Sequence, residues 1–110
     1  MAKAQKDVAY RLELTREALG KSKAEIADES GIARNAWVQY TTVDTKDARR
    51  ITVDQVHKLQ DEYGITFDWV YSGRRVGMPD ELMNRVREIE REGGLVLVDH
   101  QWVRAVRKTG

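Results

Sequence analysis

The side chains best suited to recognising a ligand lie in one short segment, residues 34–39. Arg34, Asn35 and Gln39 each carry a planar group that can form two hydrogen bonds at once with the edge of a base in the major groove of DNA. Polar residues of these types also occur on the solvent-exposed face of helices that bind no ligand. What precedes them in the chain favours base recognition over that simpler interpretation.

Two short helices and a sharp turn are predicted around this segment. The capping box formed by Ser22 and Glu25 begins a helix over 23–30, because its side chains satisfy backbone amides at the helix start. Gly31 follows, where the chain must leave the helix with positive φ, a conformation that glycine adopts at little cost. A second helix over 34–41 then carries the candidate base-reading side chains on its outer face. A helix–turn–helix of this form is a DNA-reading unit.

The inner face of that second helix is predicted from its aromatic residues. Trp37 and Tyr40 are spaced with Ile32 so that all three point toward the protein interior. Aromatic rings can also stack on bases, but this spacing favours core packing. We therefore expect a helix with an apolar side in the core and a polar side outside.

A further set of residues could bind DNA phosphates. Side chains with ammonium, guanidinium or hydroxyl groups suit this role, and the candidates are Ser22, Lys23, Thr41, Thr42, Thr45, Lys46, Arg49 and Arg50. Ser22 is expected to act chiefly as a helix cap. The net charge is only +1, so binding must depend on where cations are placed rather than on a strong overall field.

Little in the chain suits catalysis or metal binding. There is no cysteine, and the two histidines, His57 and His100, are far apart in sequence. No glycine-rich phosphate loop and no nucleophilic serine motif occur. We expect a binding protein rather than an enzyme, with no catalytic residue, no metal and no cofactor.

Three more helices are predicted within residues 1–73. The first spans about 4–19, where apolar residues recur at helical spacing. Another follows a second capping box, formed by Thr52 and Gln55, and ends at Gly64. Thr66 can cap a last short helix that ends at Gly73, with Phe67, Trp69 and Tyr71 in or near the core. Residues 41–50 are polar and predicted to form a loop.

Residues 11–73 resemble the lambda-repressor-like, or XRE-type, helix–turn–helix family of bacterial and phage regulators, in its phage-associated branch. The resemblance is carried by residues 11–12, 16–20, 22–40 and 63–73, the last reading YGITFDWVYSG. It implies a five-helix DNA-binding domain that usually acts as a dimer on a two-fold operator. It also implies that Arg34, Asn35 and Gln39 face bases, with Ala36 close to the groove floor.

The chain departs from the family pattern at two places. Where the family usually has a glutamine that contacts phosphate and braces the recognition helix, this chain has Lys23. A lysine can reach a phosphate but cannot accept the bracing hydrogen bond. After Tyr40 the family often continues with glutamate, a variable residue and glycine, whereas here Thr41 and Thr42 lead into a longer loop.

Residues 74–110 are predicted to form a sixth helix and a short β element. Residues 74–78 suit a hinge, and Pro79 suits the first turn of a helix with the apolar stripe Leu82, Val86 and Ile89. Residues 95–98 predict a strand. Residues 102–107 fit either a second strand after a turn at 99–101 or a helix capped by Asp99, and we favour the strand.

The strand at 95–98 also predicts a way to form a dimer. A lone apolar strand has unpaired edges, which the same strand of a second subunit could satisfy. The predicted dimerisation residues are Leu95, Val96, Leu97, Val98 and Trp102, of which Leu95, Leu97 and Trp102 would be buried by that pairing. The alternative is a hairpin within one chain, packed on the sixth helix.

Composition and pattern together predict a mostly α-helical protein of 110 residues. A helix–turn–helix domain at 1–73 is followed by a helix and a β-strand or hairpin at 74–110 that serve dimerisation. The expected function is a sequence-specific transcription regulator of phage or bacterial repressor or activator type, acting on double-stranded DNA. No membrane segment or leader is expected, so the predicted location is the cytoplasm, on the nucleoid when bound to DNA. The alternative is a protein-interaction module on the same scaffold, such as an antitoxin, an anti-repressor or an adaptor.

Overall fold

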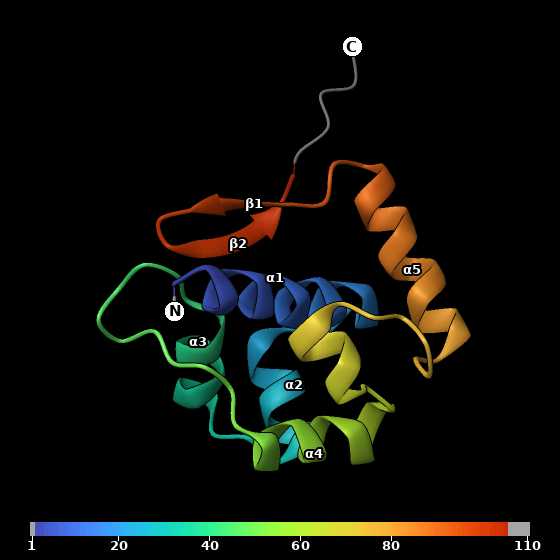
Figure 1. The fold of residues 1–110 in the computed structure, drawn as a ribbon, viewed down its shortest axis with the longest axis horizontal. Coiled ribbons are helices and arrows are strands. Elements are labelled where there is room, and N and C mark those ends of the chain that lie inside the picture. The colour runs from blue at the N-terminus through green and yellow to red at the C-terminus, as the bar shows by residue number, and fades with distance from the viewer. Residues whose placement is uncertain (1, 106–110) are drawn as a thin grey trace.

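The computed structural model describes residues 2–105, with side chains described from residue 5 onward. It is mostly helical and ends in a short antiparallel sheet, as the sequence predicted (Figure 1). The elements in chain order are α1 (Ala2–Leu19), α2 (Lys23–Ser30), α3 (Arg34–Thr41), α4 (Val53–Tyr63), the short helix η1 (Asp68–Ser72), α5 (Asp80–Arg91), β1 (Leu95–Val98) and β2 (Gln101–Arg104).

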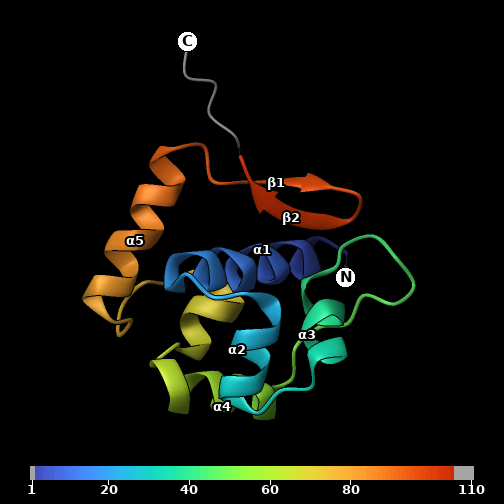
Figure 2. The same ribbon diagram turned by 180° about the vertical axis from the view of Figure 1, so that it is seen from behind.

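Helix α1 crosses the middle of the molecule and contacts elements on both sides of it. In both views α2, α3, α4 and η1 lie on one side of α1 and the β-hairpin lies on the other, with α5 beyond one end of the hairpin (Figure 1, Figure 2). Val8 and Leu12 of α1 belong to the same buried cluster as Leu59 of α4 and Val86 of α5. Residues from 1–73 and from 74–110 therefore share one hydrophobic core.

Hydrogen bonds at the N-terminal ends of α2 and α4 confirm most of the predicted capping. Ser22 and Glu25 form the complete capping box, with the Glu25 amide 3.0 Å from Ser22 Oγ and the Ser22 amide 2.8 Å from Glu25 Oε1. At α4 only half of the predicted box forms. Thr52 accepts from the Gln55 amide, but Gln55 Oε1 is buried without a hydrogen-bond partner and does not bond the Thr52 amide.

The short fifth helix forms where predicted but with π-type geometry, over Asp68–Ser72. Thr66 caps it by accepting from the Trp69 amide at 3.1 Å. Two polar contacts then fix η1 to α1: Trp69 Nε1 donates to Thr15 Oγ1 at 2.7 Å, and Arg11 Nε donates to the Val70 carbonyl at 2.9 Å. Helical turns of this π type are rare, and these two bonds tie the one at η1 to the central helix.

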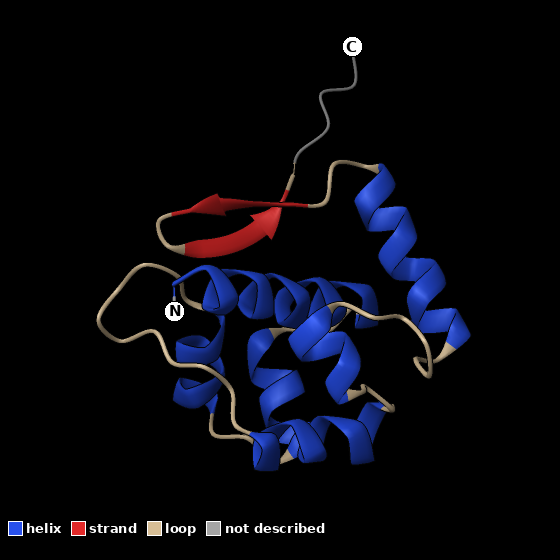
Figure 3. Cartoon of the chain, in the orientation of Figure 1, coloured by secondary structure: helices blue, strands red, loops and turns tan. Residues whose placement is uncertain are grey.

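The β element is a hairpin within one chain, which was the alternative prediction. Its two strands are joined by a short turn (Figure 3). Val96 lies opposite Val103, and Leu97 lies opposite Trp102. Asp99 and His100 both have positive φ, 50° and 68°, which is the geometry of the tight two-residue turn that joins twisted strands. The strand interpretation is confirmed for 102–104, while residues 106 and 107 lie outside the described part of the chain.

The hairpin rests mainly on α1 rather than on the sixth helix. The rings of Tyr10 and Trp102 meet edge to face, with centroids 4.8 Å apart. Leu95 is buried in the core beside them. The hairpin tip also reaches the loop after α3, where Thr42 and Gln101 form an isolated β-bridge. The hairpin thus joins the central helix to the segment that follows α3.

Candidate nucleic-acid interface

Helix α3 has one exposed side and one buried side, as predicted. Arg34 and Asn35 are exposed, and the Arg34 side chain keeps 67% of its accessible surface. Gln39 is partly exposed. Trp37 and Tyr40 on the opposite side are 1% and 8% exposed. The polar side chains that can bond base edges therefore share the free face of a helix whose other face is fixed in the core.

One residue of this face was not predicted, and one predicted residue lies at its border. Val38 is 36% exposed, and it falls one helical turn after Arg34 and next to Gln39. Its position four residues after Arg34 is the signal in the sequence, because residues at that spacing share a helix face. An apolar residue in a helix is otherwise expected in the core. Ala36 is half-buried and packs against the core cluster, so it lies away from the centre of the face that the family resemblance implied.

The turn before α3 is held by several bonds. Gly31 has φ 81°, in the left-handed region, and the amides of Gly31 and Ile32 both donate to the Ala27 carbonyl at 2.9 Å. Ile32 is buried, and Lys58 of α4 donates to the Gly31 carbonyl at 3.1 Å. The angle between α2 and α3 is therefore fixed locally and by α4.

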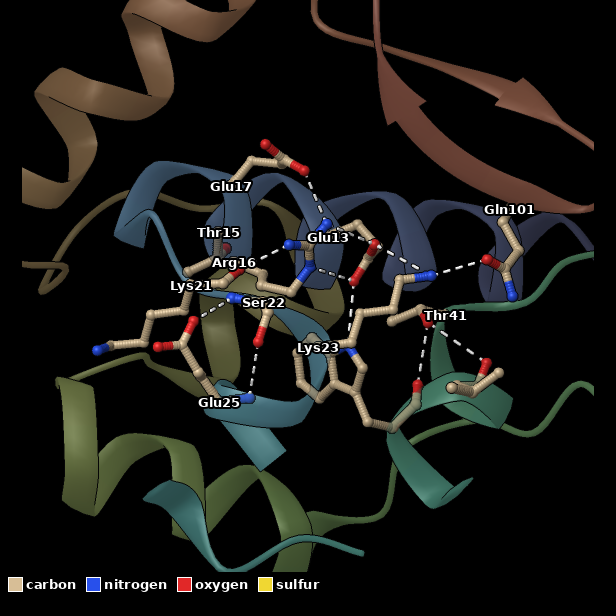
Figure 4. Close-up of polar contacts among 12 residues, drawn as sticks. Glu13, Thr15, Arg16, Glu17, Lys21, Ser22, Lys23, Glu25, Thr41 and Gln101 are labelled. Carbon is tan, nitrogen blue, oxygen red and sulfur yellow. Dashed lines mark hydrogen bonds and ion pairs between the residues drawn. The ribbon is translucent and has the colours of Figure 1, made fainter. Parts of the chain in front are cut away.

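A buried carboxylate braces α3 from behind. Glu13 of α1 is fully buried and accepts from Trp37 Nε1 at 3.0 Å (Figure 4). Arg16 approaches the same carboxylate with two parallel bonds, of 3.0 and 3.1 Å. Burial alone lowers the pKa of Arg16, but the carboxylates of Glu13 and Glu17 outweigh that effect and raise it. Sequence reasoning missed Glu13, whose only signal is a charge among the apolar residues of α1 with an arginine one turn later.

Lys23, which the sequence predicts as a phosphate contact, is engaged by other parts of the protein. Its Nζ donates to Gln101 Oε1 of the hairpin at 2.7 Å and lies 3.8 Å from Glu13 Oε1 (Figure 4). The cation is drawn inward because a buried carboxylate and a fixed amide oxygen both face it. Lys23 therefore links α2 to α1 and to β2.

The predicted hydroxyl contacts to phosphate are also corrected. Thr41 is fully buried and donates to the Trp37 carbonyl at 3.0 Å, and Thr42 donates to the Val38 carbonyl at 2.6 Å. The hydroxyl of Thr45 is buried without a partner. The cause is that the chain after α3 folds against the hairpin, where the Val43 amide donates to the His100 carbonyl at 2.8 Å. Ser22 is exposed and serves as the helix cap.

Three predicted cations remain exposed beside α3. Lys46, Arg49 and Arg50 all lie in the loop between α3 and α4. The Arg49 amide donates to the Gln39 carbonyl at 3.0 Å, which ties this loop to the end of α3. The Arg50 guanidinium lies over the Tyr71 ring at 5.4 Å. Of the three cations, Arg49 is thus tied directly to the end of α3.

The hairpin divides the predicted dimerisation residues into two sets. Leu95 is buried in the core, Trp102 packs on Tyr10, and Leu97 is partly buried on the same inner side. Val96 and Val98 are 44% and 50% exposed, because successive strand residues point to opposite faces. Of the predicted set, these two therefore remain available, together with their unpredicted neighbour Val103, which is 41% exposed.

Other kinds of site find little support in the described part of the chain. Over residues 2–105 no group of three or more histidine, cysteine or acidic residues could hold a metal ion. No helix in that range is long and apolar enough to cross a membrane. Two open cavities, each of about 210 Å³, lie against α5 and do not border α3.

Comparison with known proteins returns no family model, no curated protein and no solved structure that matches this chain.

Proposed function

We propose that this protein is a sequence-specific DNA-binding regulator of transcription, of the phage or bacterial repressor or activator type. The supporting observation is the free face of α3, where Arg34, Asn35 and Gln39 are presented by a helix that Trp37 anchors to Glu13. These side chains match the donor and acceptor pattern of base edges in the major groove. We also propose that the protein is located in the cytoplasm, and on the nucleoid when it is bound to DNA.

In this proposal each part of the surface has a distinct role. Helix α3 enters the major groove, which is wide enough to admit an α-helix. Val38 suits contact with the methyl group of thymine, since apolar side chains are used there. Lys46, Arg49 and Arg50 bind phosphates beside the groove and fix how α3 lies in it.

The outer face of the hairpin supports assembly of two copies. Val96, Val98 and Val103 form an exposed apolar face, and β1 is the strand farther from α1 (Figure 1). An uncovered strand edge with apolar side chains favours pairing with another chain. Dimers of helix–turn–helix proteins read half-sites about one turn of DNA apart, ~34 Å, so the proposal requires two copies joined there to present their α3 helices at that spacing.

The test is selection of bound fragments from a pool of random duplex DNA. We expect a motif with two-fold symmetry, and we expect Arg34→Ala and Gln39→Ala each to lose preference at particular positions, by about 1–3 kcal/mol per bidentate contact. Arg87→Ala, which removes an exposed cation from α5, is the matched control and should keep the motif.

Binding without any selected motif would contradict sequence-specific recognition. A flat response of duplex binding to salt would instead favour a protein-interaction module, since binding through phosphates weakens as salt rises. The exposed valine face of the hairpin is the surface that such a protein partner would use.

A further inference from the structure

Arg34 is paired with a carboxylate from the preceding helix. Its Nε donates to Asp28 Oδ1 at 2.9 Å, and its Nη2 donates to Asp28 Oδ2. Both side chains are exposed, at 67% and 53%, so this pair faces solvent beside the free face of α3. Two parallel bonds fix the plane of the guanidinium, where a single bond would leave it free to rotate.

The pair uses one edge of the guanidinium and leaves the other edge free. Asp28 takes the Nε hydrogen and one hydrogen of Nη2. The other hydrogen of Nη2 and one hydrogen of Nη1 point together from the end of the group, as a fork of two donors. The carboxylate therefore orients Arg34 without blocking its second bidentate edge.

A fork of two donors distinguishes among bases. In the major groove guanine offers two acceptors, N7 and O6, whereas adenine offers an acceptor at N7 and a donor at N6. Cytosine and thymine offer no such pair of acceptors. A guanidinium that is held with its end-on edge outward is therefore matched to guanine.

We infer that Asp28 is a positioning residue that makes Arg34 a reader of guanine. The inference rests on the proposed function, because it names the base that the same site recognises. Asp28 contributes in two opposite ways: its bonds hold the fork in place, while its negative charge disfavours the approach of DNA phosphates. Removing the charge should therefore weaken selectivity without weakening overall attraction.

The experiment measures base preference at the one position that Arg34 reads. The Arg34→Ala variant identifies that position in the selected motif, and we expect guanine there. Affinities are then measured for matched duplexes carrying guanine or adenine at this position. Asp28→Asn should reduce the preference for guanine by about two- to fivefold, the size expected for an exposed ion pair.

Two controls separate positioning from general effects. Glu88→Gln removes one negative charge from an exposed site on α5 and should leave the preference unchanged. In the Arg34→Ala background, Asp28→Asn should have no further effect on the preference, because its effect acts through Arg34. The midpoint of thermal unfolding should hardly change, since the pair is exposed.

Three results would overturn the inference. One is a motif without guanine at the position lost in Arg34→Ala. Another is an Asp28→Asn variant that changes affinity for both duplexes equally and keeps the preference. A protein that binds no duplex DNA would overturn both this inference and the proposed function, whereas the first two results leave DNA binding intact.

Discussion

At the scale of single residues, Glu13 decides how firmly α3 is held. Its carboxylate is fully buried and joins Arg16 and Trp37, so it links a cation and an indole that belong to different helices. Charge-assisted bonds of this kind are strong when every partner is present. They become costly when one partner is lost, because the remaining groups stay buried without bonds.

Replacing Glu13 by alanine should therefore destabilise the fold severely. We expect a loss of about 3–5 kcal/mol in the free energy of unfolding, measured by urea denaturation, because Arg16 is left buried without its main partner. Arg85→Ala, which breaks the exposed pair with Glu81, is the control and should cost about 0.5 kcal/mol or less. Equal losses in the two variants would show that the buried network is not what holds α3.

At the scale of elements, the hairpin determines which residues near α3 remain free. Its tip bonds to Val43 through His100 and to Lys23 through Gln101. These contacts turn the chain after α3 inward, and they engage a lysine that would otherwise face solvent. The cations of the loop between α3 and α4, by contrast, remain exposed.

The dependence of DNA binding on salt should separate these two classes of cation. Arg50→Ala should lower the slope of log affinity against log salt by about 1, the amount expected for one lost phosphate contact. Lys23→Ala should change that slope less, because Lys23 is held by Glu13 and Gln101. Its main effect should be faster amide exchange in β2, as the hairpin loosens. A larger change of slope for Lys23→Ala would mean that DNA displaces Gln101 from this lysine.

The sequence predicted the helices and strands better than it predicted which polar side chains remain exposed. Ser22 and Gly31 act through bonds to neighbours within a few positions, so their roles are visible in local pattern. The contact between Lys23 and Gln101 joins residues 78 positions apart, and no local signal indicates it. Thr41 and Thr42 were predicted as exposed hydroxyls for the same reason, since their burial depends on the chain folding against a distant hairpin.

At the scale of the whole molecule, one core supports two outward surfaces on different sides of α1. Helix α3 lies on one side, and the hairpin that carries the valine face lies on the other side (Figure 2). Residues 74–105 are therefore packed into the same body as the first five helices rather than attached to it. A dimer formed through the hairpin would hold the two α3 helices in a fixed relation.

Charging the valine face should abolish the proposed dimer. Val96→Lys is expected to convert a dimer to a monomer in sedimentation analysis, with an unchanged circular dichroism spectrum, because this side chain points away from the core. Val76→Lys changes another exposed valine, 86% accessible in the linker before α5, and should leave the dimer intact. A wild-type protein that sediments as a monomer at high concentration would exclude this mode of assembly.

The three tryptophans each lie where a different element meets α1. Trp37 bonds Glu13 from α3, Trp69 bonds Thr15 from η1, and Trp102 packs on Tyr10 from the hairpin. Variants that keep one indole at a time would give three separate fluorescent reporters. The order in which these elements detach during unfolding, or shift when DNA is added, could then be followed by emission wavelength alone.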